Sequence, residues 1–508
     1  MSKRQSSLLL NKSVFIPTIL FLFFVIVSSL YDNATFLDTA ERSNRWILDN
    51  FGWLFSWSPF IFLIILTIVY FSPLAKTKIG GAEAKPILSK WRWFAIALCT
   101  TIATGILFWG TAEPLYHLHQ PPSNLGLDAN SPDAARFAMS TMFMHWSFTP
   151  YGIYTITALL FALSYYNYRQ PFSIRSLLYP LFKEKAHGWI GTLMDIICLS
   201  ALVAGMAASL GTGIFAMMGG LEATLSVSKS DLILGLIGFA VVATFIISAA
   251  SGLHRGISFL SNINASAFFF LALLIFVLGP TVYLLKMGGQ GMADYGLHFF
   301  ERSTNFNAKL NNDWMNSWTV FYFANWFAWA PIAALFLGRL SVGYTVRDFI
   351  HFNLILPSLF SCVWMMIFSG IAIENDLASS GALFQILNDR GEENVMFAIF
   401  ANLPYGKAIS LLTLVMVFIS YVTAADSNIS AMSAISTRGI SPENPEAPIA
   451  LKIVWGLVIG LISWVMITSA GLDGIRLLCI LGGFPALFMI IIVAAGLVKI
   501  LLNKGRDL

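Results

Sequence analysis

The chain consists largely of long apolar runs, each long enough to cross a lipid bilayer as a helix. A spanning helix needs about 20 apolar residues, and the sequence holds about twelve such runs between short polar connections. In lipid only helices and closed barrels satisfy the backbone, and the alternating pattern of barrel strands is absent. The runs therefore predict an all-α polytopic membrane protein. The predicted spans cover residues 14–31, 52–72, 93–118, 139–165, 189–219, 231–250, 257–285, 316–338, 350–373, 406–435, 448–469 and 474–503.

Charged residues in the connections predict the orientation of these spans. Lys and Arg gather before the first span and after the second and fourth, whereas the connections after the first and ninth are richer in Asp and Glu. By the positive-inside rule, we expect both termini in the cytoplasm. The net charge of +4 is spread over the loops, so it does not indicate nucleic-acid binding.

The sequence lacks the patterns of an enzyme or an ATP-driven pump. The seven histidines show no metal-ligand spacing, and neither a G-x-S-x-G elbow nor a phosphate-binding loop is present. With 57% hydrophobic and 11% charged residues, the chain leaves no room for a nucleotide-binding domain. The cysteines lie in apolar segments, where they act as small hydrophobes. These are Cys99, Cys198, Cys362 and Cys479. We expect no enzyme activity, bound metal or cofactor, and any coupling to come from gradients or exchange.

Small residues interrupt several spans. The clearest stretches are TIATG at 101–105, AGMAASLGTG at 204–213 and VTAADS at 422–427. Such residues either let helices pack closely or let a helix unwind. Interruptions in the third and tenth spans together are typical of a transporter with a binding site near the membrane midplane.

Aromatic residues cluster on three of the spans. In WTVFYFANWFAWAP (318–331), Tyr322, Trp326 and Trp329 are spaced to share one helix face, with Asn325 beside them. MHWSFTPYGIY (144–154) and FWGTAEPLYHLHQPP (108–122) supply further rings on other spans. One such stripe also fits packing or an interfacial belt. Three converging stripes would form an aromatic cage, which attracts quaternary ammonium groups through the negative faces of the rings.

These segments resemble the signature segments of the betaine/carnitine/choline transporter family. The resemblance runs in order through spans 3 to 10. It rests on FWGTAEPLYHL, MHWSFTPYGIY, HRGISFLSNIN, LGPT, WTVFYFANWFAWAP, GRLSVGYTVRDFI and VTAADS. It implies a homotrimer in the bacterial inner membrane, with two leucine-transporter-type inverted repeats of five helices preceded by two extra helices. The implied divisions are 1–92, 93–285 and 286–508, the last beginning with a periplasmic linker.

The resemblance also implies a substrate site. By position, the aromatic residues that bind the substrate in the family correspond to Tyr116, Trp146, Trp326 and Trp329, with Tyr154 nearby. Asn325 departs from the family pattern, because members that handle glycine betaine or carnitine have a tryptophan at that position. An amide there removes one wall and adds an N–H donor, which suits a compact ligand with an oxygen close to its nitrogen, such as trimethylamine N-oxide. A hydrogen bond from Asn325 to a neighbouring helix is the alternative.

The sodium sites of the family are only partly matched. Its G-x-G-x-G run in span 3 corresponds here to Thr101, Ala103 and Gly105. Where sodium-coupled members have two threonines in span 5, this chain has Leu202 and Met206, which offer no hard oxygen ligand. We therefore expect the sodium site that uses these two span-5 positions to be absent.

The remaining residues do not identify the coupling ion. In span 10, Thr423 and Ala424 match the family's Thr-Ser pair, so one hydroxyl remains. The sodium-independent antiporters of the family have an arginine in span 7, and residues 256–286 contain none. The intramembrane carboxylates Glu113 and Asp426 are candidate gate partners or proton carriers, and Glu113 is also a candidate anchor for a broken helix.

The sequence thus predicts a secondary active transporter that moves a small trimethylammonium compound across the bilayer by alternating access. Trimethylamine N-oxide, glycine betaine, choline and carnitine all fit the predicted cage. An antiporter that exchanges carnitine-like betaines is the alternative, and a channel is a third reading that would require a continuous polar pore. Asp195 in span 5 is expected to pair with a neighbouring helix, with its partner undetermined.

Overall fold

The computed structural model of the chain describes residues 9–101, 105–251, 254–306, 310, 312–438, 447–503 and 505. In these residues almost all regular structure is helical, and two short strands, β1 (Leu9–Leu10) and β2 (Thr437–Arg438), pair antiparallel. The longer helices are α1 (Lys12–Tyr31), α2 (Asn33–Phe71), α3 (Lys90–Thr101), α4 (Gly105–His119), α5 (Pro132–Trp146), α6 (Phe148–Ala162), α8 (Trp189–Leu225), α9 (Asp231–Ser251), α10 (His254–Leu278), α11 (Thr281–Leu297), α14 (Phe321–Arg339), α16 (Leu356–Ala378), α19 (Gly406–Ile435) and α20 (Ile449–Leu502). Shorter helices are α7 (Tyr179–Phe182), α12 (Phe299–Thr304), α13 (Asn312–Met315), α15 (Val346–Ile350), α17 (Ala382–Arg390) and α18 (Val395–Ala401). The prediction of an all-α polytopic membrane protein is confirmed.

Each predicted span has a helical counterpart, but the boundaries differ. In the described part of the chain, 8 helices are long and apolar enough to cross a membrane, or up to 9 if the bent pair Ile263–Leu278 and Thr281–Leu297 counts as one span. The number is below the predicted twelve for three reasons. The third and fourth spans are each divided between two shorter helices, α20 contains the last two spans, and the predicted seventh span is counted only as part of the bent pair. Within α20 the helix bends at Gly471, whose φ of 55° favours glycine.

The predicted interruptions have different outcomes. In the third span the helix assignment stops at Thr101 and resumes at Gly105, and residues 102–104 lie outside the described residues. In the tenth span, α19 continues through 422–427, so of the two alternatives, close packing and unwinding, unwinding does not occur there. Small side chains at 204–213 likewise leave α8 continuous. They serve close helix packing instead.

A break that small-residue patterns did not reveal lies in the fourth span. Helix α5 ends at Trp146 and α6 begins at Phe148, with non-helical backbone at Ser147. Pro150 explains this break, because a proline ring clashes with the carbonyl group four residues earlier in a continuous helix. That carbonyl belongs to Trp146. Proline therefore separates the two helices at the residue that carries one of the predicted site rings.

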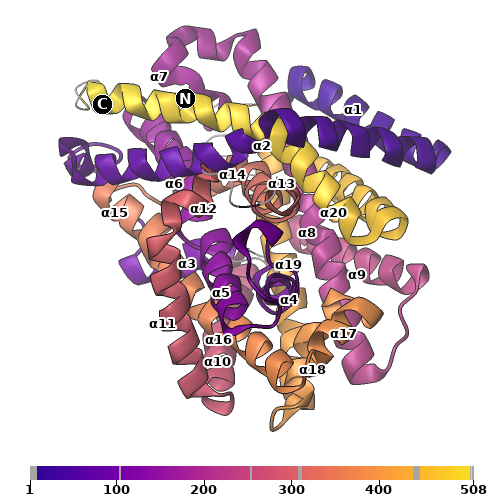
Figure 1. Cartoon of the computed structure of the whole chain (residues 1–508). Helices are drawn as coiled ribbons and strands as arrows, with labels where there is room; N and C mark the ends of the chain where they lie inside the picture. The colour runs from indigo at the N-terminus through magenta and orange to yellow at the C-terminus, as the bar shows by residue number, and fades with distance from the viewer. Residues whose placement is uncertain are drawn as a thin grey trace.

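Helix α14 lies in the middle of the bundle and contacts α6, α8 and α20 (Figure 1). Close approach of α14 and α20 depends on glycine: a Cβ at Gly483 would lie 2.2 Å from the carbonyl oxygen of Ala324. Helix α4 packs in turn against α5 and α16. Helices α4, α5, α8, α14 and α20 thus bring the predicted aromatic segments together in one region of the bundle.

Candidate substrate-binding site

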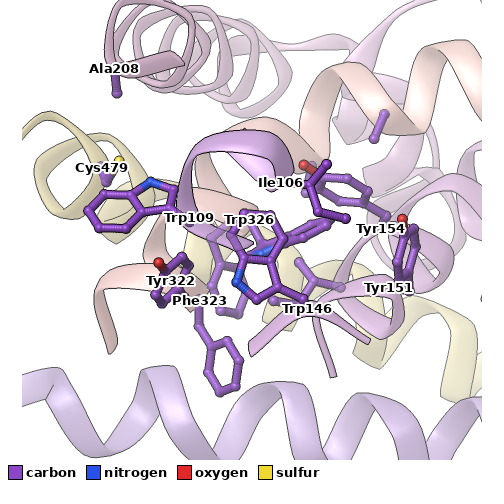
Figure 2. Packing of buried hydrophobic residues seen from close by; sticks show 14 of the residues in the cluster. Ile106, Trp109, Trp146, Tyr151, Tyr154, Ala208, Tyr322, Phe323, Trp326 and Cys479 are labelled. Carbon is purple, nitrogen blue, oxygen red and sulfur yellow. The ribbon is translucent and has the colours of Figure 1, made fainter. Parts of the chain in front are cut away.

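A cavity of about 60 Å³ lies where these helices meet. Its wall combines aromatic rings with small and polar side chains from α4, α5, α6, α8, α14 and α20. The residues are Gly105, Trp109, Trp146, Tyr154, Ala208, Ser209, Thr212, Phe321, Asn325, Trp326, Trp329, Ile475 and Cys479. Figure 2 shows Trp109, Trp146, Tyr154 and Trp326 gathered in this region, with Ala208 and Cys479 set apart from most of the rings. Five of the six predicted site residues, all except Tyr116, therefore line one cavity.

Trp326 is the centre of the aromatic cluster. Its ring centroid lies 4.7 Å from Tyr154, 5.4 Å from Tyr151 and 6.2 Å from Trp146, at tilted or edge-on angles. Such angles are the favoured packing of aromatic quadrupoles. The side chain of Trp326 is buried and its orientation is fixed by three ring contacts. A fixed ring presents a constant face to the cavity, which a cation-binding site requires.

The stripe predicted on residues 318–331 holds only in part. Trp326 and Trp329 line the cavity, as does Asn325 beside them. Tyr322 shares their helix but is not part of the lining, and its ring packs 5.3 Å from Trp146. Trp329 is seated against Gly205 of α8, where a Cβ would lie 3.2 Å from the indole ring.

The sequence left two roles open for Asn325, a place in the substrate site and a hydrogen bond to a neighbouring helix. The side chain lines the cavity, and its Oδ1 lies 3.4 Å from the thiol sulfur of Cys479 on α20. With the amide in this orientation the thiol donates to Oδ1, so the NH2 group remains the donor end of the side chain. The neighbouring helix therefore orients the amide without removing it from the cavity.

Tyr116 lies apart from the cavity. Its hydroxyl donates to the carboxylate of Glu392, and its ring packs 5.0 Å from Trp318 and 6.2 Å from Phe384. Instead, Trp109 from the same segment lines the cavity. Trp109 precedes Tyr116 by two helical turns, so both rings lie on one face of α4. The sequence signal identified the correct face, but the depth along it depends on how α4 packs.

Sequence reasoning also missed the small and polar side of the cavity. Ser209 and Thr212 of α8 and Ile475 and Cys479 of α20 line it, together with Phe321. The small-residue run at 204–213 was a usable signal for α8, since small side chains leave space beside bulky rings. No comparable pattern marks the positions in α20.

Glu113 is fully buried next to the cavity-lining Trp146. One carboxylate oxygen lies 3.1 Å from Nε2 of His117 and 2.6 Å from Nδ1 of His145, and the other accepts the indole N–H of Trp146 at 2.9 Å. Among the described residues, Glu113, His117 and His145 are the group whose side-chain types could hold a metal ion. Both histidines lie within hydrogen-bond distance of the carboxylate, an arrangement that satisfies it without a metal.

The predicted coupling residues do not reach the cavity lining. The hydroxyl of Thr423 donates to the carbonyl groups of Ile419 and Ser420 on its own helix, and Asp426 is buried in α19. Leu202 and Met206, at which the resemblance implied the loss of a sodium site, are buried in α8. The side chain of Thr101 and the whole of Ala103 lie outside the described residues.

Asp195 finds its partner within a connecting segment rather than on a neighbouring span. Arg175 donates to it from Nε at 2.7 Å, from Nη2 at 2.5 Å and from its backbone N–H at 3.1 Å. Charge-assisted bonds of this kind are the strong form of an arginine–carboxylate pair. The pair anchors the start of α8 to the loop that follows α6.

A bundle of apolar helices around a small, ring-lined cavity defines the class of helical membrane transport proteins. Residues 13–506 match the family described as BCCT, betaine/carnitine/choline family transporter, and the chain belongs to this family. Its members are transporters, not enzymes, and the resemblance predicted from the signature segments is confirmed.

Three relatives illustrate the extent of the similarity. An ectoine/hydroxyectoine transporter of Virgibacillus pantothenticus is 29% identical over 98% of this chain and 97% of its own. Glycine betaine transporter 1 of Vibrio parahaemolyticus is 32% identical over 90% of this chain and 87% of its own. The glycine betaine transporter OpuD of Bacillus subtilis is 30% identical over 93% of this chain and 90% of its own.

Proposed function

We propose that this protein is a secondary transporter that carries a small methylated ammonium compound across the membrane by alternating access. The methylated nitrogen would lie among Trp146, Tyr154, Trp326 and Trp329, and the rest of the ligand would face α8 and α20. The observation that carries the proposal is the convergence of these rings on one cavity whose described lining contains no Asp, Glu, Lys or Arg.

The chemistry of the wall suits a quaternary cation. A trimethylammonium group has no N–H to donate, so it forms no N–H hydrogen bond with a carboxylate or a carbonyl oxygen. Oxygen ligands would therefore not select it over sodium or ammonium. Aromatic faces attract it by about 0.5 to 2 kcal/mol per ring when water is excluded.

Asn325 narrows the substrate class further. Its NH2 group would donate to an oxygen of the ligand, and no ring stands at that position to cover a long hydrocarbon chain. We infer a preference for ligands with an oxygen close to the nitrogen, of which trimethylamine N-oxide is the smallest. The relatives are described as transporters of glycine betaine or ectoine, so zwitterions with a carboxylate belong to the same candidate set.

Further features are proposed on the family resemblance. Residues 93–285 and 286–508 would form the two inverted repeats that rock against each other, behind two extra helices in residues 1–92. The protein would assemble as a homotrimer in the bacterial inner membrane with both termini in the cytoplasm. Substrate/product exchange of carnitine-like betaines is the second candidate function, since hydroxyl ligands for sodium are sparse at the matched positions.

Uptake into proteoliposomes tests the proposal. Trimethylamine N-oxide, glycine betaine, choline and carnitine would each be offered with a sodium gradient, without one, and with internal substrate. We expect saturable uptake of at least one of them, and uptake that requires internal substrate would identify an exchanger. Absence of uptake for all four, or single-channel currents at open-channel rates, would contradict a carrier for these compounds.

A further inference from the structure

The group that holds Trp146 in place is a buried carboxylate. The indole ring of Trp146 lines the cavity, whereas its N–H donates at 2.9 Å to Glu113, which is not part of the lining. Glu113 and Trp146 lie on different helices, α4 and α5, and both are buried. A hydrogen bond of this kind fixes the rotation of the ring and polarises it toward the carboxylate.

The contacts of the two histidines bear on the charge of the cluster. His145 contacts Glu113 through Nδ1, and its Nε2 lies 2.9 Å from the hydroxyl of Thr319, which can donate to a neutral ring or accept from a charged one. His117 contacts Glu113 through Nε2, and its buried Nδ1 has no hydrogen-bond partner among the described residues. A charged imidazole would bury an unpaired N–H there, which costs more than an unpaired lone pair. The arrangement therefore fits an ionised carboxylate beside a neutral His117.

An ionised carboxylate thus lies one indole ring away from the cavity. Among the described residues, the ion-pair partners of Glu113 are His117 and His145. The positive group that the ring contacts lead to is Arg476. Its guanidinium lies 5.8 Å from the ring of the cavity-lining Phe321 and 5.2 Å from that of Trp318, and the Trp318 ring in turn lies 4.8 Å from that of His117. Arg476 has its own partner, Asp473, at 3.2 Å.

We infer that Glu113 is a positioning residue that makes the cage selective for cations by acting through Trp146. The carboxylate orients the indole and raises the electron density of the ring face that meets the ligand. The negative charge stays out of the cavity, so it cannot coordinate sodium directly. This arrangement gives cation preference without a carboxylate ligand, and the inference rests on the proposed function.

The test compares a cation with its neutral carbon isostere. Inhibition constants for choline and for 3,3-dimethylbutan-1-ol would be measured against uptake of the transported substrate in proteoliposomes. Glu113→Gln keeps an acceptor for the indole N–H but removes the charge. We expect the inhibition constant for choline to rise about tenfold, with less than about a twofold change for the alcohol. A purely structural role would weaken both ligands together, and equal changes, or none, would overturn the inference.

A second variant tests the route through the indole and does not depend on how well Glu113→Gln folds. Trp146→Phe keeps a ring in the cavity wall but removes the N–H donor. We expect choline to lose its advantage over the alcohol by about tenfold, and Glu113→Gln added to Trp146→Phe to change choline by less than about twofold. A full tenfold effect of Glu113→Gln in the Trp146→Phe background, or an unchanged preference in Trp146→Phe alone, would refute action through the indole.

Thr319→Val is the matched control within the cluster. It removes the hydrogen bond to His145 and leaves the carboxylate charge and the indole N–H in place. The ratio of the two inhibition constants should stay within about twofold of wild type. A shift as large as that of Glu113→Gln would assign the effect to packing and overturn the inference. Absence of uptake for all four candidate compounds would instead count against the proposed function, whereas uptake of another compound without choline inhibition in the wild-type protein would overturn the inference.

Discussion

The two sides of the cavity differ in chemistry. Helices α5, α6 and α14 contribute the rings of Trp146, Tyr154 and Trp326, whereas α8 and α20 contribute small or polar side chains such as Ala208 and Cys479. In the proposed function the ring side faces the methylated nitrogen, and the small side leaves space for the other end of the ligand. Large rings on one side leave room for a ligand only because the side chains on the other side are small.

The largest expected effect comes from removing the central ring. Trp326→Leu should weaken substrate binding by about thirtyfold or more, because one cation–π contact is lost and the neighbouring rings lose the partner that orients them. Affinity is measured by the concentration dependence of uptake. Trp53→Leu is the control, since Trp53 lies on the outer surface of α2 with 61% exposure. Comparable losses in both variants would show that the ring side has no special role.

The small side is tested through Gly483. Gly483→Ala places a methyl group 2.2 Å from the carbonyl oxygen of Ala324, so α14 and α20 must separate. We expect a loss of about 1 to 3 kcal/mol in stability, seen as a lower unfolding temperature in detergent. Gly289→Ala in α11 is the matched control, because nothing lies within 4 Å of a Cβ there. An unfolding temperature unchanged by Gly483→Ala would mean that the close approach is dispensable.

A smaller effect is expected at the border between the two sides. Asn325→Trp introduces a ring at this position and removes the amide donor. The preference for trimethylamine N-oxide over glycine betaine should fall by about tenfold, since a hydrogen bond to a charged oxygen is lost while ring contact is gained. Uptake of both compounds in one preparation gives the ratio. An unchanged ratio would remove the argument for the amide donor.

Local patterns predicted some parts of the site well. The spacing of Trp326 and Trp329, with Asn325 beside them, required only that the segment be helical, and all three line the cavity. The choice of Tyr116 failed as a cavity residue because the third-span segment contains two rings on one face, and only packing against α5 and α16 decides which one reaches the cavity. Of the two alternatives for the small residues in the tenth span, unwinding does not occur, because small residues permit a break without requiring one. At Pro150 a break is present, whereas Pro331 lies inside the continuous helix α14, so proline alone does not decide where a helix ends.

The sequence by itself determined that this protein lies in a lipid bilayer, that it is helical and which family it belongs to. The helices follow because apolar runs in lipid have one stable local structure. The family follows because the signature segments are continuous in the chain. Only the tertiary structure decided which side chains share the cavity, what Asp195 pairs with, and that Glu113 holds Trp146 in place. These are contacts between segments that local patterns do not connect. They depend on the depth and rotation of each helix, which are set by how glycines, prolines and rings fit together across the bundle.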